Sequence, residues 1–95
     1  MTHEEIYIKL REIIQKEASV GNPEQKDLKV EDISLDTHIQ HDLGCDSMST
    51  MAIVMDIEDE FGIDIPDDAL MKYVIVKDAV AGIALLLENQ NEKES

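Results

Sequence analysis

Apolar side chains recur at helical spacing in three separate segments of this 95-residue chain, and that pattern limits its fold more than any other feature. The spacing predicts helices over about residues 3–18, 47–61 and 76–89. No segment alternates apolar and polar residues for long enough to predict a strand, and the sequence contains no internal repeat. The sequence therefore predicts an all-α domain.

The ends of the predicted helices carry their own signals. Thr2 and Glu5 form a capping-box pattern at the start of the first helix. Gly21-Asn22-Pro23 should end the first helix, and Gly62 should end the second. Pro66 can begin a short additional helix. We therefore expect a four-helix bundle with three long helices and one short one.

We expect a long connection between the first two helices over residues 20–41, where the apolar residues have no sustained period. A loop of this length is unusual in a small domain and is often functional. Scattered apolar anchors suggest that it packs against the core: Leu28, Val30, Ile33, Leu35 and Ile39. We expect one domain over residues 1–89, with an aliphatic core because the chain has no Trp, and a disordered tail over residues 90–95.

The strong negative charge limits the possible partners. The chain has 22 acidic and 8 basic residues, a net charge of −14, and no Lys or Arg from Val30 to Met71. This argues against binding to nucleic acid or anionic membranes and favours partners with basic surfaces. A single cysteine fits a reducing cytoplasm, and neither a signal peptide nor a stretch long enough to span a bilayer is expected.

The predicted second helix has two apolar sides. One side carries Ile53, Val54, Ile57 and Phe61, and the opposite side carries Met48, Met51, Ala52 and Met55 together with Asp56 and Asp59. Methionines at this spacing belong to a core more often than to a surface. A small helical domain cannot easily bury both sides, however, so an exposed methionine face ringed by acids is the alternative.

Ser47, at the start of this helix, has three possible roles. Either Asp46 or Ser47 is a good N-cap. A catalytic nucleophile is a poor interpretation, because "GCDSMS" does not fit G-x-S-x-G and the only base nearby is His41. The third role is covalent attachment, since a serine in the first turn of a helix is exposed.

The segment over about residues 36–70 resembles the attachment region of acyl carrier proteins. The resemblance rests on three groups of residues: Asp42-Leu43-Gly44-Cys45-Asp46-Ser47-Met48, Glu58-Asp59-Glu60-Phe61 and Ile65-Pro66. It implies that a holo-acyl-carrier-protein synthase attaches 4′-phosphopantetheine from coenzyme A to Ser47 through a phosphodiester. The thiol of that arm would hold acyl groups as thioesters for fatty-acid or related enzymes, and the monomeric protein itself would catalyse nothing.

Two surfaces are expected in such a carrier. The two-sided helix suggests that partners with basic surfaces dock on Met48, Met51, Met55, Asp56, Glu58 and Asp59. The resemblance implies an acyl-chain pocket lined by Val54, Ile57, Ile65, Leu70, Tyr73 and Ala79.

Several alternatives stay open. A peptidyl, D-alanyl or polyketide carrier would use the same arm, and an acidic helical adaptor would have no prosthetic group. No metal site is expected. The pair His38 and His41, with Asp42 beside it, has no evident helix or third ligand, and the acids from Asp56 to Asp68 do not have the spacing of an EF-hand. Cys45 should fill a small packing site.

Overall fold

The computed structural model describes residues 2–66 and 73–94, and within these ranges the chain forms three α-helices. Along the chain these are α1 (His3–Gly21), two 3₁₀ turns, η1 (Pro23–Gln25) and η2 (Val30–Asp32), then α2 (Ser47–Phe61) and α3 (Val76–Glu94). No strand occurs in the described residues, which confirms the all-α class. The fourth, short helix predicted from Pro66 falls mostly on residues 67–72, outside the described part.

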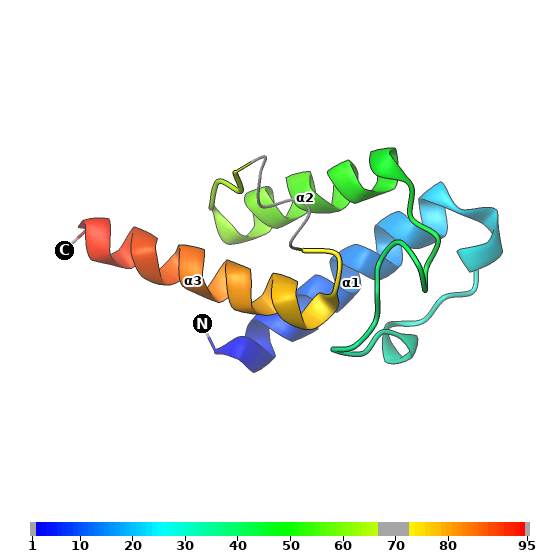
Figure 1. Ribbon diagram of the computed structural model, residues 1–95, viewed down its shortest axis with the longest axis horizontal. Helices are drawn as coiled ribbons and strands as arrows, with labels where there is room; N and C mark the ends of the chain where they lie inside the picture. Colours follow the sequence, from blue (N-terminus) through cyan, green and yellow to red (C-terminus); the bar gives the residue numbers. More distant parts are fainter. Residues whose placement is uncertain (1, 67–72, 95) are drawn as a thin grey trace.

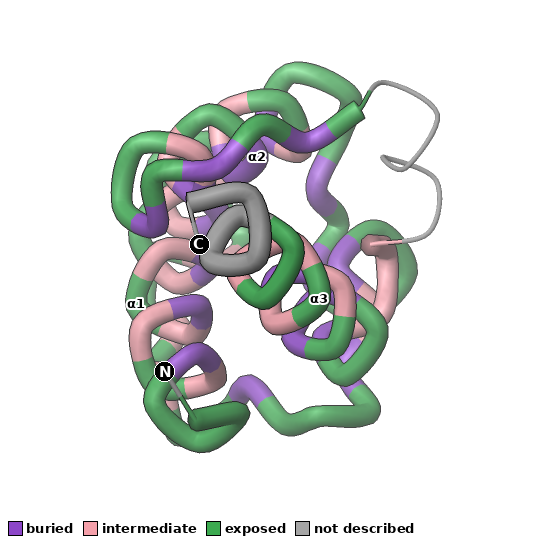
Figure 2. The backbone as a smooth tube through the Cα atoms, turned by 90° about the vertical axis from the view of Figure 1, so that its left-hand side faces the viewer, coloured by how far each residue is buried: buried purple, intermediate pink, exposed green. Residues whose placement is uncertain are grey.

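Helix α1 packs against both α2 and α3, and the three helices with the long loop can be followed in Figure 1. The buried stretches lie on the inner sides of the helices (Figure 2). The buried apolar residues are Ile6, Leu10, Ile14, Ala18, Ile33, Ile39, Leu43, Cys45, Ile53, Val54, Ile57, Phe61, Ile63, Ile65, Val76, Ala79, Val80 and Ile83. Phe61 is the only aromatic residue among the buried residues that the structure describes, which confirms the expected aliphatic core.

The first helix begins and ends on local signals. The backbone N–H of Glu5 donates to Thr2 Oγ1 over 3.1 Å, and the N–H of Thr2 donates to Glu5 Oε1 over 3.0 Å, which confirms the capping box. The helix runs three residues past the predicted end at 18. It stops at Asn22, whose extended backbone is the conformation that a following proline imposes.

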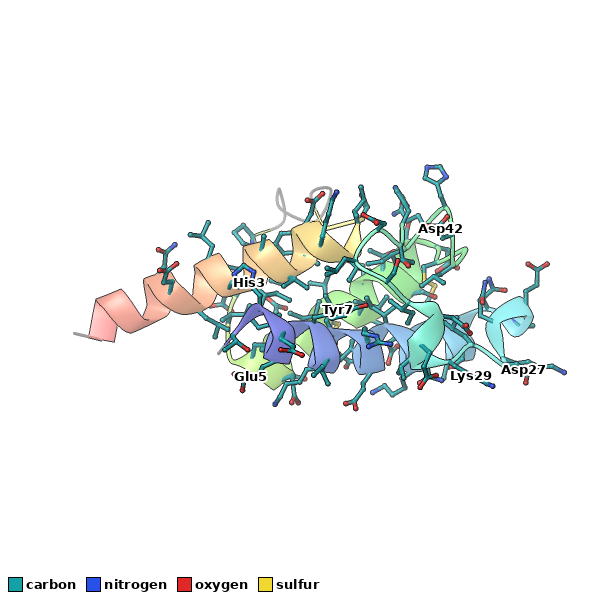
Figure 3. All side chains as sticks on the ribbon, turned by 90° about the horizontal axis from the view of Figure 1, so that it is seen from below. His3, Glu5, Tyr7, Asp27, Lys29 and Asp42 are labelled. Atoms are coloured by element: carbon teal, nitrogen blue, oxygen red, sulfur yellow. The ribbon has the colours of Figure 1, made fainter. Side chains whose placement is uncertain are left out.

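The long loop is tied to one side of α1 by three polar side chains spaced four residues apart. Tyr7 Oη donates to the carbonyl of Ile33 over 3.0 Å, and Gln15 Nε2 donates to that of Leu28 over 3.0 Å. Between them, Arg11 donates twice to the carbonyl of Val30. Figure 3 shows the loop near Asp27 and Lys29 alongside the second half of this helix.

The apolar anchors of this loop behave in two ways. Ile33 and Ile39 are buried, and Leu28 packs against the core, as predicted. Leu35 is exposed, so its predicted role as an anchor is wrong. Its carbonyl instead accepts the N–H of Lys77, and the carbonyl of Thr37 accepts the N–H of Val76. The loop thereby supplies acceptors for two of the unpaired donors at the start of α3.

Helix α2 has the predicted bounds, whereas α3 differs from the prediction at its C-terminal end. Helix α2 ends at Gly62, whose φ of 65° is the left-handed conformation that glycine adopts readily. Helix α3 runs to Glu94, so the predicted helix end at Asn89 is wrong. The disordered tail over residues 90–95 stays a prediction. The segment after Gly82 contains no glycine or proline that would stop the helix.

Candidate functional site

Ser47 is the first residue of α2 and is exposed. The carboxylate of Asp46 accepts the backbone N–H of Ser49 over 2.8 Å, so Asp46 is the N-cap. Within the described residues, no hydrogen bond engages the hydroxyl of Ser47. Of the two capping residues that the sequence allowed, the structure selects Asp46, and the Ser47 hydroxyl is therefore free for chemistry.

The electrostatics at this helix start are mixed. The N–H that Asp46 accepts from Ser49 holds the pKa of the Asp46 carboxyl below its ordinary value, so this group is ionised at neutral pH. The first turn of α2 contains no acid. The partial positive charge of a helix N-terminus favours an anion such as a phosphodiester, and the Asp46 carboxylate opposes it. The residues present thus fit a covalently held phosphodiester better than a free anion.

The turn before Ser47 is built from the residues that the motif predicted. Asp42 Oδ2 accepts the N–H of His38 over 2.7 Å and closes a five-residue turn. Leu43 is buried, and Gly44 has a φ of 67°, which a residue with a side chain rarely adopts. These residues fix the path of the chain into α2.

Cys45 and His38 are the other reactive side chains of this segment that make contacts. Cys45 is buried, and burial raises the pKa of its thiol, with a further contribution from Asp46. This is the packing role predicted for it. His38 Nδ1 accepts the backbone N–H of His41 over 3.0 Å. No cluster of three or more potential metal ligands occurs in the described part of the chain.

The methionine side of α2 faces solvent. Met48, Met51 and Met55 are 82%, 45% and 60% exposed, and Asp59 is also exposed. The aliphatic side of the same helix is buried throughout. Of the two interpretations open at the sequence level, the structure supports the surface one.

Two of the acids assigned to this face point elsewhere. Asp56 Oδ2 lies 3.4 Å from Nζ of Lys16 on α1. Glu58 Oε2 accepts the N–H of Ile65 over 2.9 Å and so holds the segment after α2. Of the six residues predicted to bind partners, four are therefore outward-facing: Met48, Met51, Met55 and Asp59.

Two ion pairs join α1 to α2. Lys9 Nζ lies 2.8 Å from Glu60 Oε1, and Lys16 Nζ lies near Asp56, as described above. Lys16 Nζ also lies 3.5 Å from Oε1 of Glu17 on its own helix. Burial raises the pKa of the Glu17 carboxyl, and the nearby Asp56 carboxylate raises it further. The lysines of α1 thus offset part of the charge on the α1-facing edge of α2.

The predicted acyl-chain residues lie mostly within one core. Val54, Ile57, Ile65 and Ala79 are buried. Tyr73 is partly buried against Gly82 of α3, so close that a Cβ at Gly82 would collide with its ring. Leu70 lies outside the described residues. A groove of about 180 Å³ opens elsewhere, between α1 and α2, and is lined by Lys9, Glu12, Ile13, Lys16 and Glu60.

Comparison with known proteins identifies the family. A family model described as "Phosphopantetheine attachment site" matches residues 9–83. The acyl carrier protein of Campylobacter hominis is 33% identical over 86 residues, which cover 90% of this chain and 99% of that protein. The chain belongs to the acyl carrier protein family. Its role is that of a carrier, and its cofactor is 4′-phosphopantetheine.

Further proteins similar to this chain are also named acyl carrier proteins. That of Rickettsia bellii is 44% identical over 72 residues, covering 66% of this chain and 84% of the relative. That of Lactobacillus johnsonii is 38% identical over 80 residues, which cover 84% of this chain and 90% of the relative. The solution structure of an apo doublet acyl carrier protein from prodigiosin biosynthesis matches with a TM-score of 0.58 and 25% identity, over 85% of this chain and 37% of that one.

Within the described part, none of the helices is both long and apolar enough to cross a bilayer.

Proposed function

We propose that Ser47 is the residue that carries the 4′-phosphopantetheine, attached from coenzyme A by a holo-acyl-carrier-protein synthase. The observation that carries this assignment is the division of roles at the start of α2: Asp46 caps the helix, and the adjacent Ser47 hydroxyl is exposed without a hydrogen-bond partner among the described residues. The chain itself catalyses no step. It presents acyl groups, held as thioesters on the arm, to the active sites of other proteins.

Ser49 is the natural alternative site, and its surroundings argue against it. It lies two residues further along α2, is only 8% exposed, and packs against Gly21 of α1. A synthase could not reach its hydroxyl without separating the two helices. Incubation of the apo-protein with coenzyme A and a promiscuous holo-synthase should therefore add one phosphopantetheine, and peptide mapping should place it on Ser47. Its appearance on Ser49 would overturn the assignment.

For the cargo we favour acyl groups of fatty-acid or related synthesis, because the curated relatives are named acyl carrier proteins. The other candidate is a peptidyl, D-alanyl or polyketide carrier with the same arm. The relative from prodigiosin biosynthesis supports keeping this option, although the chain spans only 37% of that protein. The intact mass of the protein from its native host distinguishes them. A native protein without any attached group would favour an adaptor role.

We further propose a docking face on α2, made of Met48, Met51, Met55 and Asp59, for enzymes with basic surfaces. Flexible thioether side chains adapt to different partner surfaces, and a carboxylate at the rim attracts basic side chains. With a net charge of −14, the protein suits such partners better than nucleic acid or anionic membranes. It would act as a monomer in the cytoplasm.

Charge reversal at the docking face should slow association. Asp59→Lys should lower the association rate with the holo-synthase by roughly 3- to 10-fold at low salt and weaken its salt dependence, because a rim charge acts mainly through steering. Stopped-flow binding at several salt concentrations measures this. Glu88→Lys, an exposed acid on α3, makes the same change in net charge away from the face and serves as the control. Equal slowing by both variants would contradict a local docking face.

The buried residues Val54, Ile57, Ile65 and Ala79, with Tyr73, are proposed to shelter the first part of an acyl chain. Aliphatic packing can part to admit a chain, and each buried methylene contributes up to about 0.8 kcal/mol, less the cost of opening the core. Melting temperature should rise from the holo form through butyryl and hexanoyl to octanoyl forms and then level off. Equal melting temperatures across the series would mean that the chain stays in solvent.

A further inference from the structure

We infer that the C-terminal end of α1 positions the attachment serine. Asn22 is the positioning residue, and Gly21 contributes through its close contact with Ser49. The inference rests on the proposed function, in which Ser47 is the attachment site. It assigns a role to the part of α1 that extends past the predicted end at residue 18 and leads into the long loop. Contacts from this end reach the chain on both sides of Ser47.

The first contact lies before Ser47. Asn22 Nδ2 donates to the backbone carbonyl of Leu43 over 3.2 Å, and a Cβ at Gly44 would lie only 2.8 Å from the same nitrogen. The other end of the Asn22 amide is also held, because its Oδ1 accepts the N–H of Glu24 over 3.1 Å. The amide thus bridges the start of η1 and the Leu43–Gly44 turn.

The second contact lies after Ser47. Ser49 is buried against Gly21 so closely that any Cβ at Gly21 would collide with the Ser49 hydroxyl. The N–H of Ser49 is also the group that the Asp46 carboxylate caps. The end of α1 therefore contacts the residue that organises the first turn of α2.

These two contacts matter because no hydrogen bond within the described residues fixes the Ser47 side chain itself. Its side chain is exposed and unbonded within the described residues, so its place relative to the body of the protein depends on the backbone on either side. In the transfer, the Ser47 oxygen forms a bond to the coenzyme A phosphorus that bears the pantetheine arm. The pyrophosphate bond of coenzyme A breaks, 3′,5′-ADP leaves, and the hydroxyl proton passes to a base of the synthase. A synthase must bring the hydroxyl into line with that phosphorus, and small misplacements of a reacting group are costly in rate. Loss of the Asn22 contact should release the turn at Leu43–Gly44.

The test compares two substitutions at one position. Asn22→Asp retains the oxygen that accepts the Glu24 N–H but replaces the donor to the Leu43 carbonyl with an oxygen that cannot donate. Asn22→Ala loses both bonds. In holo-synthase assays both variants should lower kcat for phosphopantetheine transfer by about 10-fold, with KM nearly unchanged because the docking face is intact.

A purely structural role for Asn22 would lower the melting temperature without changing kcat on the folded protein. Amide hydrogen exchange supplies a second readout, and exchange at Gly44, Cys45 and Asp46 should accelerate in Asn22→Asp. Val20→Ala, the control, alters an 80% exposed residue in the last turn of α1 and should leave both readouts unchanged.

Wild-type kcat and exchange in Asn22→Asp would overturn the inference. Phosphopantetheine transfer to Ser47→Ala in the same assay would instead overturn the proposed attachment site, so the two failures are distinguishable.

Discussion

Ser47→Ala should accept no phosphopantetheine from coenzyme A while keeping the melting temperature of the parent protein. Transfer needs the hydroxyl, whereas the helix does not, because Asp46 supplies the cap through its bond to the N–H of Ser49. Alanine is also the residue that a helix accommodates best. Chemistry and stability are thus assigned to two adjacent side chains.

The neighbouring substitution Asp46→Ala is the matched comparison. It should lower the melting temperature by a few degrees, since the first turn of α2 loses its capping acceptor, while transfer to Ser47 continues. Intact-mass spectrometry after incubation with the holo-synthase and thermal unfolding by circular dichroism measure the two effects. A stable Asp46→Ala together with a strongly destabilised Ser47→Ala would reverse the roles that we assign to these residues.

Features that depend on neighbouring residues in the chain could be predicted from the sequence. The capping box of Thr2 and Glu5 and the end of α2 at Gly62 are set within one helical turn, so their signals are local. The end of α1 is predicted too early because the apolar spacing stops before residue 18, whereas the helix continues to Gly21, until Pro23 imposes an extended backbone on Asn22.

The side chains of the site depended on tertiary contacts, which periodicity does not encode. Asp56 and Asp59 both fell on the methionine side of the helical wheel, yet Asp56 lies toward Lys16 of α1 and only Asp59 is fully outward. Glu58 is held by the backbone of Ile65 after the helix. A one-helix projection cannot show which edge a neighbouring helix covers.

The contacts that hold the long loop were missed for a related reason. Tyr7, Arg11 and Gln15 have a visible spacing of four residues, but polar residues at this spacing usually mark a solvated helix face. Their role follows from the unpaired carbonyls of the loop that runs past them. The bond from Asn22 to the Leu43 carbonyl spans 21 residues and left no local signal.

The two sides of α2 should respond in opposite ways to the same truncation. Ile57 is 2% exposed among the core residues of all three helices, so Ile57→Ala leaves a cavity and should cost about 2–5 kcal/mol in the free energy of unfolding. Met55, two residues earlier, is 60% exposed, and Met55→Ala should cost less than about 0.5 kcal/mol.

Urea unfolding of the apo-proteins measures both differences. The affinity for the holo-synthase is the second measurement. Met55→Ala should weaken this affinity, because the thioether belongs to the proposed docking face. A cost of about 2 kcal/mol or more for Met55→Ala would place this side chain in the core. Retention of full affinity would remove Met55 from the docking face. Because both substitutions lie on one helix and remove similar volumes, the contrast isolates the side of the helix as the cause.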